Sequence, residues 1–112
     1  SLTNVLEPRG AQIEIARNGK EALDALERSA ADPAKQIDLV LMDVMMPVMD
    51  GLTATQEIRK DSRWKDLPVL MLTAKAMPDD QERCMAAGAN DYMAKPLDVD
   101  KLLSLVRVWM PR

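Results

Sequence analysis

Short apolar runs alternate along the chain with segments in which apolar residues recur at helical spacing. Four of these runs predict β-strands, at residues 11–16, 37–42, 68–72 and 91–94. The run at 37–42 is continuously apolar apart from Asp38, which is typical of a strand covered by helices on both faces. In the run at 11–16, Ile13 and Ile15 share one side, which suits an edge strand.

Helices are predicted between and after these strands. They are expected from Asn18 to Asp32, over 52–60, from Pro78 to Gly88, and from Asp98 or Asp100 to Trp109, and residues 2–7 suit the end of another helix. Asn18 with Glu21 three residues later forms a capping-box pattern, and Gly88 is placed as a C-terminal cap. Strands that alternate with helices in this way predict an α/β fold with a parallel sheet and right-handed crossovers.

Polar residues follow or end three of the predicted strands. They are Asp43, Thr73 and Lys95, separated by 30 and 22 residues. The C-terminal ends of parallel strands lie at one edge of a sheet, so these side chains are expected to converge there. A carboxylate, a hydroxyl and an ammonium group together suit a site that handles a phosphoryl group. Taken singly, each has an ordinary structural explanation, as a loop cap, a β-prone residue and a solvated lysine.

Composition narrows the function classes. The 112 residues fit one domain, and 47% hydrophobic with 29% charged residues supports a globular core. A net charge of −3 without a basic face argues against nucleic-acid binding, and no apolar stretch reaches the roughly 18 residues of a membrane span. One cysteine and no signal-peptide pattern suit a reducing cytoplasm. The chain has no histidine, so a phosphohistidine donor would have to lie on another protein or domain.

Four segments together resemble the response-regulator receiver domains of two-component signalling. Among these, they are similar to the receivers attached to hybrid histidine kinases. The phosphoacceptor segment of that family is similar to residues 38–43 with Met46-Pro47 and Met49-Asp50-Gly51, its switch segment to Leu72-Thr73-Ala74, its closing segment to residues 87–96, and the start of its second helix to residues 18–23. The resemblance covers nearly the whole chain, and the motifs occur in the family's order.

The resemblance implies a flavodoxin-like, doubly wound parallel sheet of strand order 2-1-3-4-5, with helices on both faces, in a single receiver domain spanning residues 1–112. Asp43 would accept a phosphoryl group from a histidine kinase or histidine phosphotransfer domain, and a kinase or output domain is expected to be fused in some arrangements. Lys95 would offset the phosphoryl charge, Thr73 and Tyr92 would act as switch residues, and the Lys95–Pro96 peptide bond would be cis. Such a domain is a phosphoacceptor, not a turnover enzyme, and no other cofactor site is expected.

The resemblance also implies Mg²⁺, held by Asp43, by the backbone carbonyl of Met45 and by two adjacent acids at the end of a first strand. No two acids before Asp43 are adjacent, and Asp79-Asp80 begins a helix. The first strand is therefore not visible, and the domain is expected to be incomplete at its N-terminus. In the family's strand order, the first strand lies between the strands at 11–16 and 37–42. Without it, these two strands would be separated by a gap of about 10 Å.

Three explanations remain open: residues left out before Leu2, a truncation, or a partner that supplies the strand in a homodimer or strand-swapped dimer. Omission is the favoured explanation. Two rival functions are a pseudo-receiver that binds partners without being phosphorylated, and a phosphatase of flavodoxin-like fold that uses an aspartyl phosphate. The second rival would need another acid or base near Asp43, and the sequence offers no candidate.

Overall fold

The computed structural model describes residues 12–43, 48–73 and 78–110. Within them, a parallel sheet has the order β1-β2-β3-β4, formed by β1 (Ile13–Ala16), β2 (Leu39–Asp43), β3 (Val69–Thr73) and β4 (Asp91–Ala94). All four strands lie within two residues of their predicted bounds. The predicted α/β class with a parallel sheet is confirmed.

The helices of the described residues are α2 (Gly19–Ala30), α3 (Val48–Lys60), α4 (Pro78–Ala87) and α5 (Val99–Trp109), with short 3₁₀ turns η2 (Pro33–Lys35) and η3 (Ser62–Trp64). The Asn18 side chain caps α2 by accepting a hydrogen bond from the Glu21 amide at 2.8 Å, as predicted. Helix α3 begins at Val48, four residues before the predicted start at Leu52. The prediction placed the helix start after Gly51, but a glycine inside a helix costs only about 1 kcal/mol and did not end this one.

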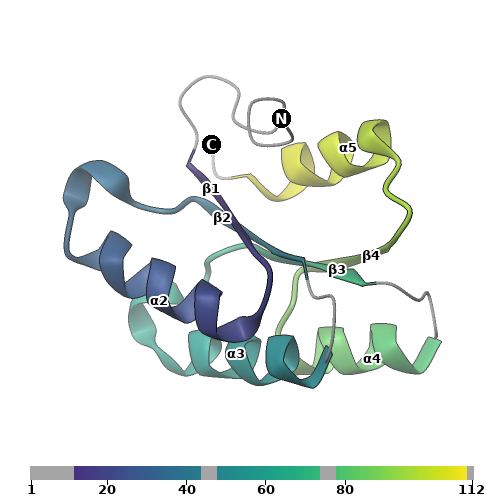
Figure 1. The fold of residues 1–112 in the computed structure, drawn as a ribbon, viewed down its shortest axis with the longest axis horizontal. Coiled ribbons are helices and arrows are strands. Elements are labelled where there is room, and N and C mark those ends of the chain that lie inside the picture. The colour runs from purple at the N-terminus through teal and green to yellow at the C-terminus, as the bar shows by residue number, and fades with distance from the viewer. Residues whose placement is uncertain (1–11, 44–47, 74–77, 111–112) are drawn as a thin grey trace.

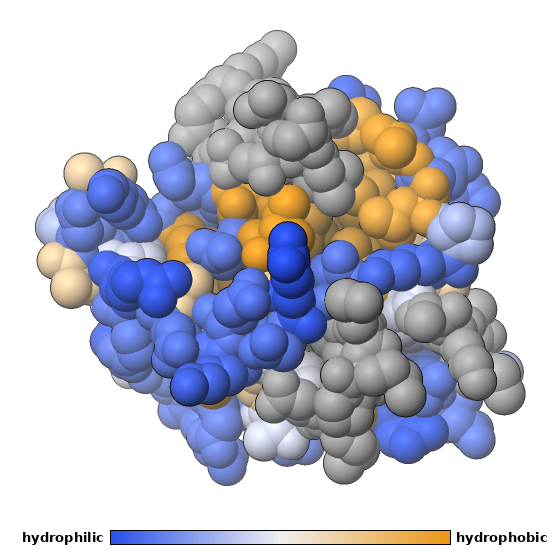
Figure 2. All heavy atoms as spheres, in the orientation of Figure 1, coloured by the Kyte–Doolittle hydropathy of each residue, from blue (hydrophilic) through white to orange (hydrophobic). Residues whose placement is uncertain are grey.

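Helices cover both faces of the sheet. Figure 1 shows α2, α3 and α4 on one face and α5 on the other. Along β2 the side chains alternate accordingly: Val40 and Met42 are buried beneath α2, α3 and α4, whereas Leu39 and Leu41 are buried with α5. Hydrophobic residues gather on the α5 side in Figure 2, and the surface over α2 is mainly hydrophilic. No helix among the described residues is long and apolar enough to cross a membrane.

The expected gap between the first two strands is wrong, because β1 pairs directly with β2. Ile13 is opposite Leu39, and the register continues to Ala16 opposite Met42. This pairing satisfies backbone groups that an empty slot would have left unpaired. The observed order in the described residues is therefore β1-β2-β3-β4, not a sheet with a vacant second position. Residues 2–7, predicted as a helix end, lie outside the described residues.

Asp38, the polar exception in the apolar run, helps to fix this pairing. Its backbone amide donates to the Gln12 carbonyl at 2.8 Å, and its carboxylate accepts from the Gln12 amide at 2.9 Å. The pair extends the β1–β2 ladder one residue toward the start of both strands. A one-residue slip would break both bonds and turn the apolar residues of β1 to the wrong faces.

Candidate functional site

Asp43 and Lys95 meet at the C-terminal edge of the sheet. Asp43 is the last residue of β2, and Lys95 follows β4 directly. The lysine Nζ lies 2.5 Å from Asp43 Oδ1, with the two side chains 32% and 28% exposed. Oδ1 itself is buried, and from the described part of the chain it receives no hydrogen bond of ordinary geometry; its contact there is the ion pair with Lys95. The solvent-accessible part of the aspartate is therefore the rest of its side chain.

The strand register explains why residues so far apart in sequence meet. Strand β3 lies between β2 and β4, with Leu72 opposite Asp43 and Thr73 opposite Ala94. The Lys95 amide donates to the Thr73 carbonyl at 2.7 Å, which continues the β3–β4 ladder by one residue. The lysine side chain thus starts beside the end of β3 and reaches across it to β2. The Lys95–Pro96 peptide bond is cis, which confirms that prediction.

Thr73 ends β3 between the two charged residues. It is 1% exposed, and its neighbour across the ladder, Ala94, immediately precedes Lys95. Tyr92 lies two residues before Ala94, opposite Met71, and its half-buried ring packs against the core beneath α2, α3 and α4. Asp43, Thr73 and Lys95 therefore occupy one edge of the sheet, and Tyr92 lies further along β4, away from that edge, on the α4 side. Met45 and Ala74 lie outside the described residues.

The described residues do not fit a magnesium site. Across 12–43, 48–73 and 78–110, no three acidic, cysteine or histidine residues gather in a group that could hold a metal ion. Mg²⁺ requires an octahedron of oxygen ligands, usually including carboxylates and several waters. Asp43 already has one oxygen engaged by Lys95. One carboxylate in this state is too little for a metal centre.

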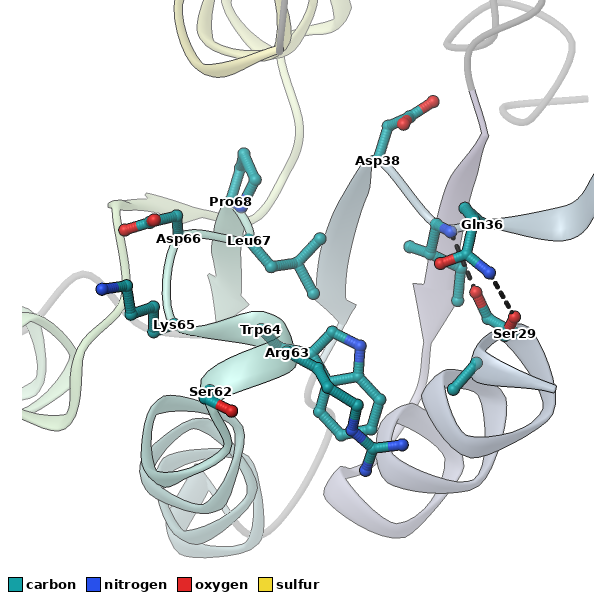
Figure 3. Close-up of a pocket in the computed structure, with 12 residues that line it drawn as sticks. Ser29, Gln36, Asp38, Ser62, Arg63, Trp64, Lys65, Asp66, Leu67 and Pro68 are labelled. Carbon is teal, nitrogen blue, oxygen red and sulfur yellow. Dashed lines mark hydrogen bonds between the residues drawn. The ribbon is translucent and has the colours of Figure 1, made fainter. Parts of the chain in front are cut away.

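A cavity of about 340 Å³ lies at the opposite end of the sheet, beside the residues that precede β2 and β3. Figure 3 shows Gln36, Trp64 and Leu67 around it, with the Gln36 amide donating to the Ser29 carbonyl at 2.7 Å. None of the predicted phosphoryl-handling residues lines this cavity. It is separate from the edge that carries Asp43.

Arg59 is a structurally central residue that the sequence analysis passed over. Its guanidinium group lies near the end of α3 and donates three hydrogen bonds to two other segments, the η3 turn and the loop between α4 and β4. Burial lowers the pKa of Arg59 from its ordinary value, and the charge of Asp66 acts in the opposite direction. Two of its three acceptors are backbone carbonyls, which leave no pattern of residue types to read.

Known structures place the fold in the CheY-like class of α/β domains. The Vibrio cholerae chemotaxis protein CheY4 matches with a TM-score of 0.76 at 29% identity, covering 97% of this chain and 86% of that one. The receiver domain of the sensor histidine kinase PA1611 from Pseudomonas aeruginosa PAO1, solved with a magnesium ion in its active-site cleft, matches with a TM-score of 0.69 at 32% identity, covering 96% and 81%.

The chain belongs to the response regulator receiver domain family, whose pattern matches residues 1–107. It is 40% identical to the DNA-binding dual master transcriptional regulator RpaA of Synechocystis sp., over 83% of this chain and 39% of RpaA. It is 38% identical to hybrid signal transduction histidine kinase M of Dictyostelium discoideum, over 92% of this chain and 4% of the kinase. The chain thus spans less than half the length of these curated relatives. The family is a signalling module of two-component systems, not a turnover enzyme.

Proposed function

We propose that this chain is a phosphoacceptor receiver domain of a cytoplasmic two-component phosphorelay, in which Asp43 is the phosphorylated residue. The observation that carries the proposal is the contact between Asp43 and Lys95 at the C-terminal edge of the sheet. An open α/β sheet presents its chemistry at this edge. Because the chain has no histidine, the donor is a phosphohistidine of a kinase or a phosphotransfer domain. The similarity to a hybrid histidine kinase supports a partner, or a fused domain, of that kind.

In the transfer step, the accessible carboxylate oxygen of Asp43 attacks the phosphorus. An oxygen–phosphorus bond forms, the phosphorus–nitrogen bond to the donor breaks, and its electron pair returns to the imidazole. The Lys95 ammonium, already beside Oδ1, offsets the negative charge that accumulates on the phosphoryl oxygens. Thr73 lies at the end of the strand between Asp43 and Lys95, and its hydroxyl donates a hydrogen bond to a phosphoryl oxygen of the product.

The phosphorylated state biases two arrangements of the protein. Phosphoryl groups on ordinary side chains add a charge of about −1.5 to −2. Movement of Thr73 toward this group frees space for the Tyr92 ring, which now packs against the core on the α4 side. The face formed by α4, β4 and α5 then changes its affinity for a partner by a population shift.

A second candidate function is a pseudo-receiver, which uses the same fold as an interaction module without phosphorylation. The observation that favours it is that the described ranges contain no group of three or more acidic, cysteine or histidine residues that could hold a metal ion. The two candidates differ in one measurable property, the ability of Asp43 to become an acyl phosphate.

Incubation with acetyl phosphate and magnesium chloride, followed by intact mass spectrometry, separates the two. The phosphoacceptor proposal expects a mass gain of one phosphoryl group that is absent from Asp43→Asn. The matched control is Asp66→Asn, which alters an exposed acid at the far end of the sheet and should leave the gain unchanged. A folded wild-type protein that gains no mass, with or without magnesium, would support the pseudo-receiver instead.

A further inference from the structure

Arg59 joins three segments at the N-terminal edge of the sheet, far along the strands from Asp43. Its Nε donates to the Gly88 carbonyl at 2.8 Å, its Nη1 to the Trp64 carbonyl at 3.0 Å, and its Nη2 to Asn90 Oδ1 at 2.7 Å. The guanidinium thereby connects the end of α3 with the η3 turn and with the loop between α4 and β4. These bonds point in different directions, as the planar fork of an arginine allows and the single ammonium group of a lysine does not.

Asn90 passes this connection to the sheet. Its side-chain Oδ1 also accepts a hydrogen bond from the Val69 backbone amide at 2.9 Å, and its backbone amide donates to the Val69 carbonyl at 2.8 Å. The regular β3–β4 ladder begins at the next pair, Leu70 opposite Asp91. Arg59 therefore holds the residue that sets the first step of this ladder.

Gly88 interlocks with the stem of Arg59. The backbone of Gly88 has φ of 111°, in the region that favours glycine, and a Cβ built there would lie 2.6 Å from Arg59 Cγ. The arginine stem thus occupies the space that any other side chain at position 88 would need. The carbonyl of the same glycine accepts the Arg59 Nε bond, so position and hydrogen bond depend on each other.

We infer that Arg59, with Gly88 and Asn90, is a clamp that positions Lys95 against Asp43 by fixing β4 on β3 from the opposite edge of the sheet. The ladder that begins at Asn90 ends with the Lys95 amide bonded to the Thr73 carbonyl. Strand β4 has only four residues and is partly exposed throughout, so few buried contacts of its own fix it lengthwise. Arg59 is thus a positioning residue, and its effect on phosphoryl transfer rests on the function proposed above.

Amide hydrogen exchange tests the structural half of this inference without any phosphorylation. In Arg59→Met, exchange of the Lys95 amide should accelerate about three- to tenfold beyond the change at the amides of β2, a factor corresponding to one net hydrogen bond. The matched control is Arg63→Met, which removes another arginine and its ion pairs to Glu27 and Asp61. Its effect should be equal at both strands. An equal acceleration at both strands in Arg59→Met would overturn the clamp.

If Arg59→Met does not fold, Arg59→Lys replaces it, because it keeps the charge and the stem but not the three-way bonding. In this variant, exchange of the Lys95 amide should again accelerate more than exchange in β2, but by a smaller factor. Exchange at Lys95 that stays in step with β2 in this folded variant would again refute the inference.

A double-mutant cycle tests the functional half. Initial rates of phosphorylation by acetyl phosphate are compared for wild type, Arg59→Met, Lys95→Met and the double variant, all at a temperature where circular dichroism shows each to be folded. Arg59→Met should slow the reaction about three- to tenfold when Lys95 is present and have little effect when it is absent. Independent effects that multiply would show that Arg59 does not act through Lys95. If no protein is phosphorylated, the proposed function fails, and the exchange experiment alone decides the clamp.

Discussion

Replacing Gly88 by alanine should destabilise the fold far more than an added methyl group normally does. The alanine would have to adopt φ near 111°, and its Cβ would lie 2.6 Å from Arg59 Cγ unless one of them moves. The arginine stem cannot move away without weakening the Nε bond to the Gly88 carbonyl and the Nη2 bond to Asn90. The substitution therefore combines backbone strain with the loss of hydrogen bonds.

The expected cost follows from these contributions. A non-glycine residue in a left-handed conformation costs roughly 1–2 kcal/mol. Each of the two weakened hydrogen bonds contributes about 1 kcal/mol. Alanine also restricts the unfolded chain, which offsets about 0.4–1 kcal/mol. We expect a net loss of about 2–3.5 kcal/mol in the free energy of unfolding, which corresponds to a fall of roughly 10–15 °C in the melting temperature.

Urea denaturation followed by circular dichroism measures this loss, with an unchanged m-value as the sign that the unfolded state is not altered. Part of the cost should disappear when Arg59→Ala removes the clashing stem, so the double variant should lose less than the sum of the two single variants. A cost below about 0.5 kcal/mol, the usual range of a neutral surface change, would refute the reasoning. Strict additivity would show that the Gly88 and Arg59 contacts do not depend on each other.

Three further outcomes are expected. Leu41→Ala, at a fully buried position, should cost about 2–5 kcal/mol in urea denaturation, whereas Val108→Ala, at a position 71% exposed, should stay within about 0.5 kcal/mol. Burial raises the pKa of the Cys84 thiol, so Ellman's reagent should react slowly with the folded protein; the unfolded thiol ionises first, so stability should fall as the pH rises above about 9, and Cys84→Ala should remove that loss. The hydrogen bond from Arg63 lowers the pKa of Asp61, so this pair should stabilise the fold at pH values above the ordinary carboxyl range and lose its effect as the pH falls. The melting temperature of Asp61→Asn should therefore fall less on acidification than that of the wild type, and added salt should reduce this difference.

The strands, the helix caps and the meeting of distant residues could be predicted from the sequence because each depends on a local rule or on the geometry of a parallel sheet. A buried apolar run predicts β2, and Asn18 with Glu21 predicts the start of α2. Once the strands are parallel, Asp43 and Lys95 must end at the same edge, and their contact follows. No tertiary contact had to be known for these predictions.

The remaining features depend on tertiary interactions that cannot be recognised from the type of a single residue. The three acceptors of Arg59 lie up to 31 residues from it in the sequence, and two are carbonyls that every residue carries. The start of α3 at Val48 depends on whether a glycine ends a helix, which the surrounding contacts decide. The direct pairing of β1 with β2 was missed because the family order was taken to reserve a place between them.

The two edges of the sheet have different tasks. At the N-terminal edge, side chains bond to backbone groups of the neighbouring segment, as Asp38 does with Gln12 and as Asn90 does with Val69. Both contacts precede the ladders whose far ends carry Asp43 and Lys95. Because a one-residue slip in a strand reverses its faces, fixing the first step fixes the last. The C-terminal edge can therefore present charged residues at a defined spacing without using them to hold the strands in register.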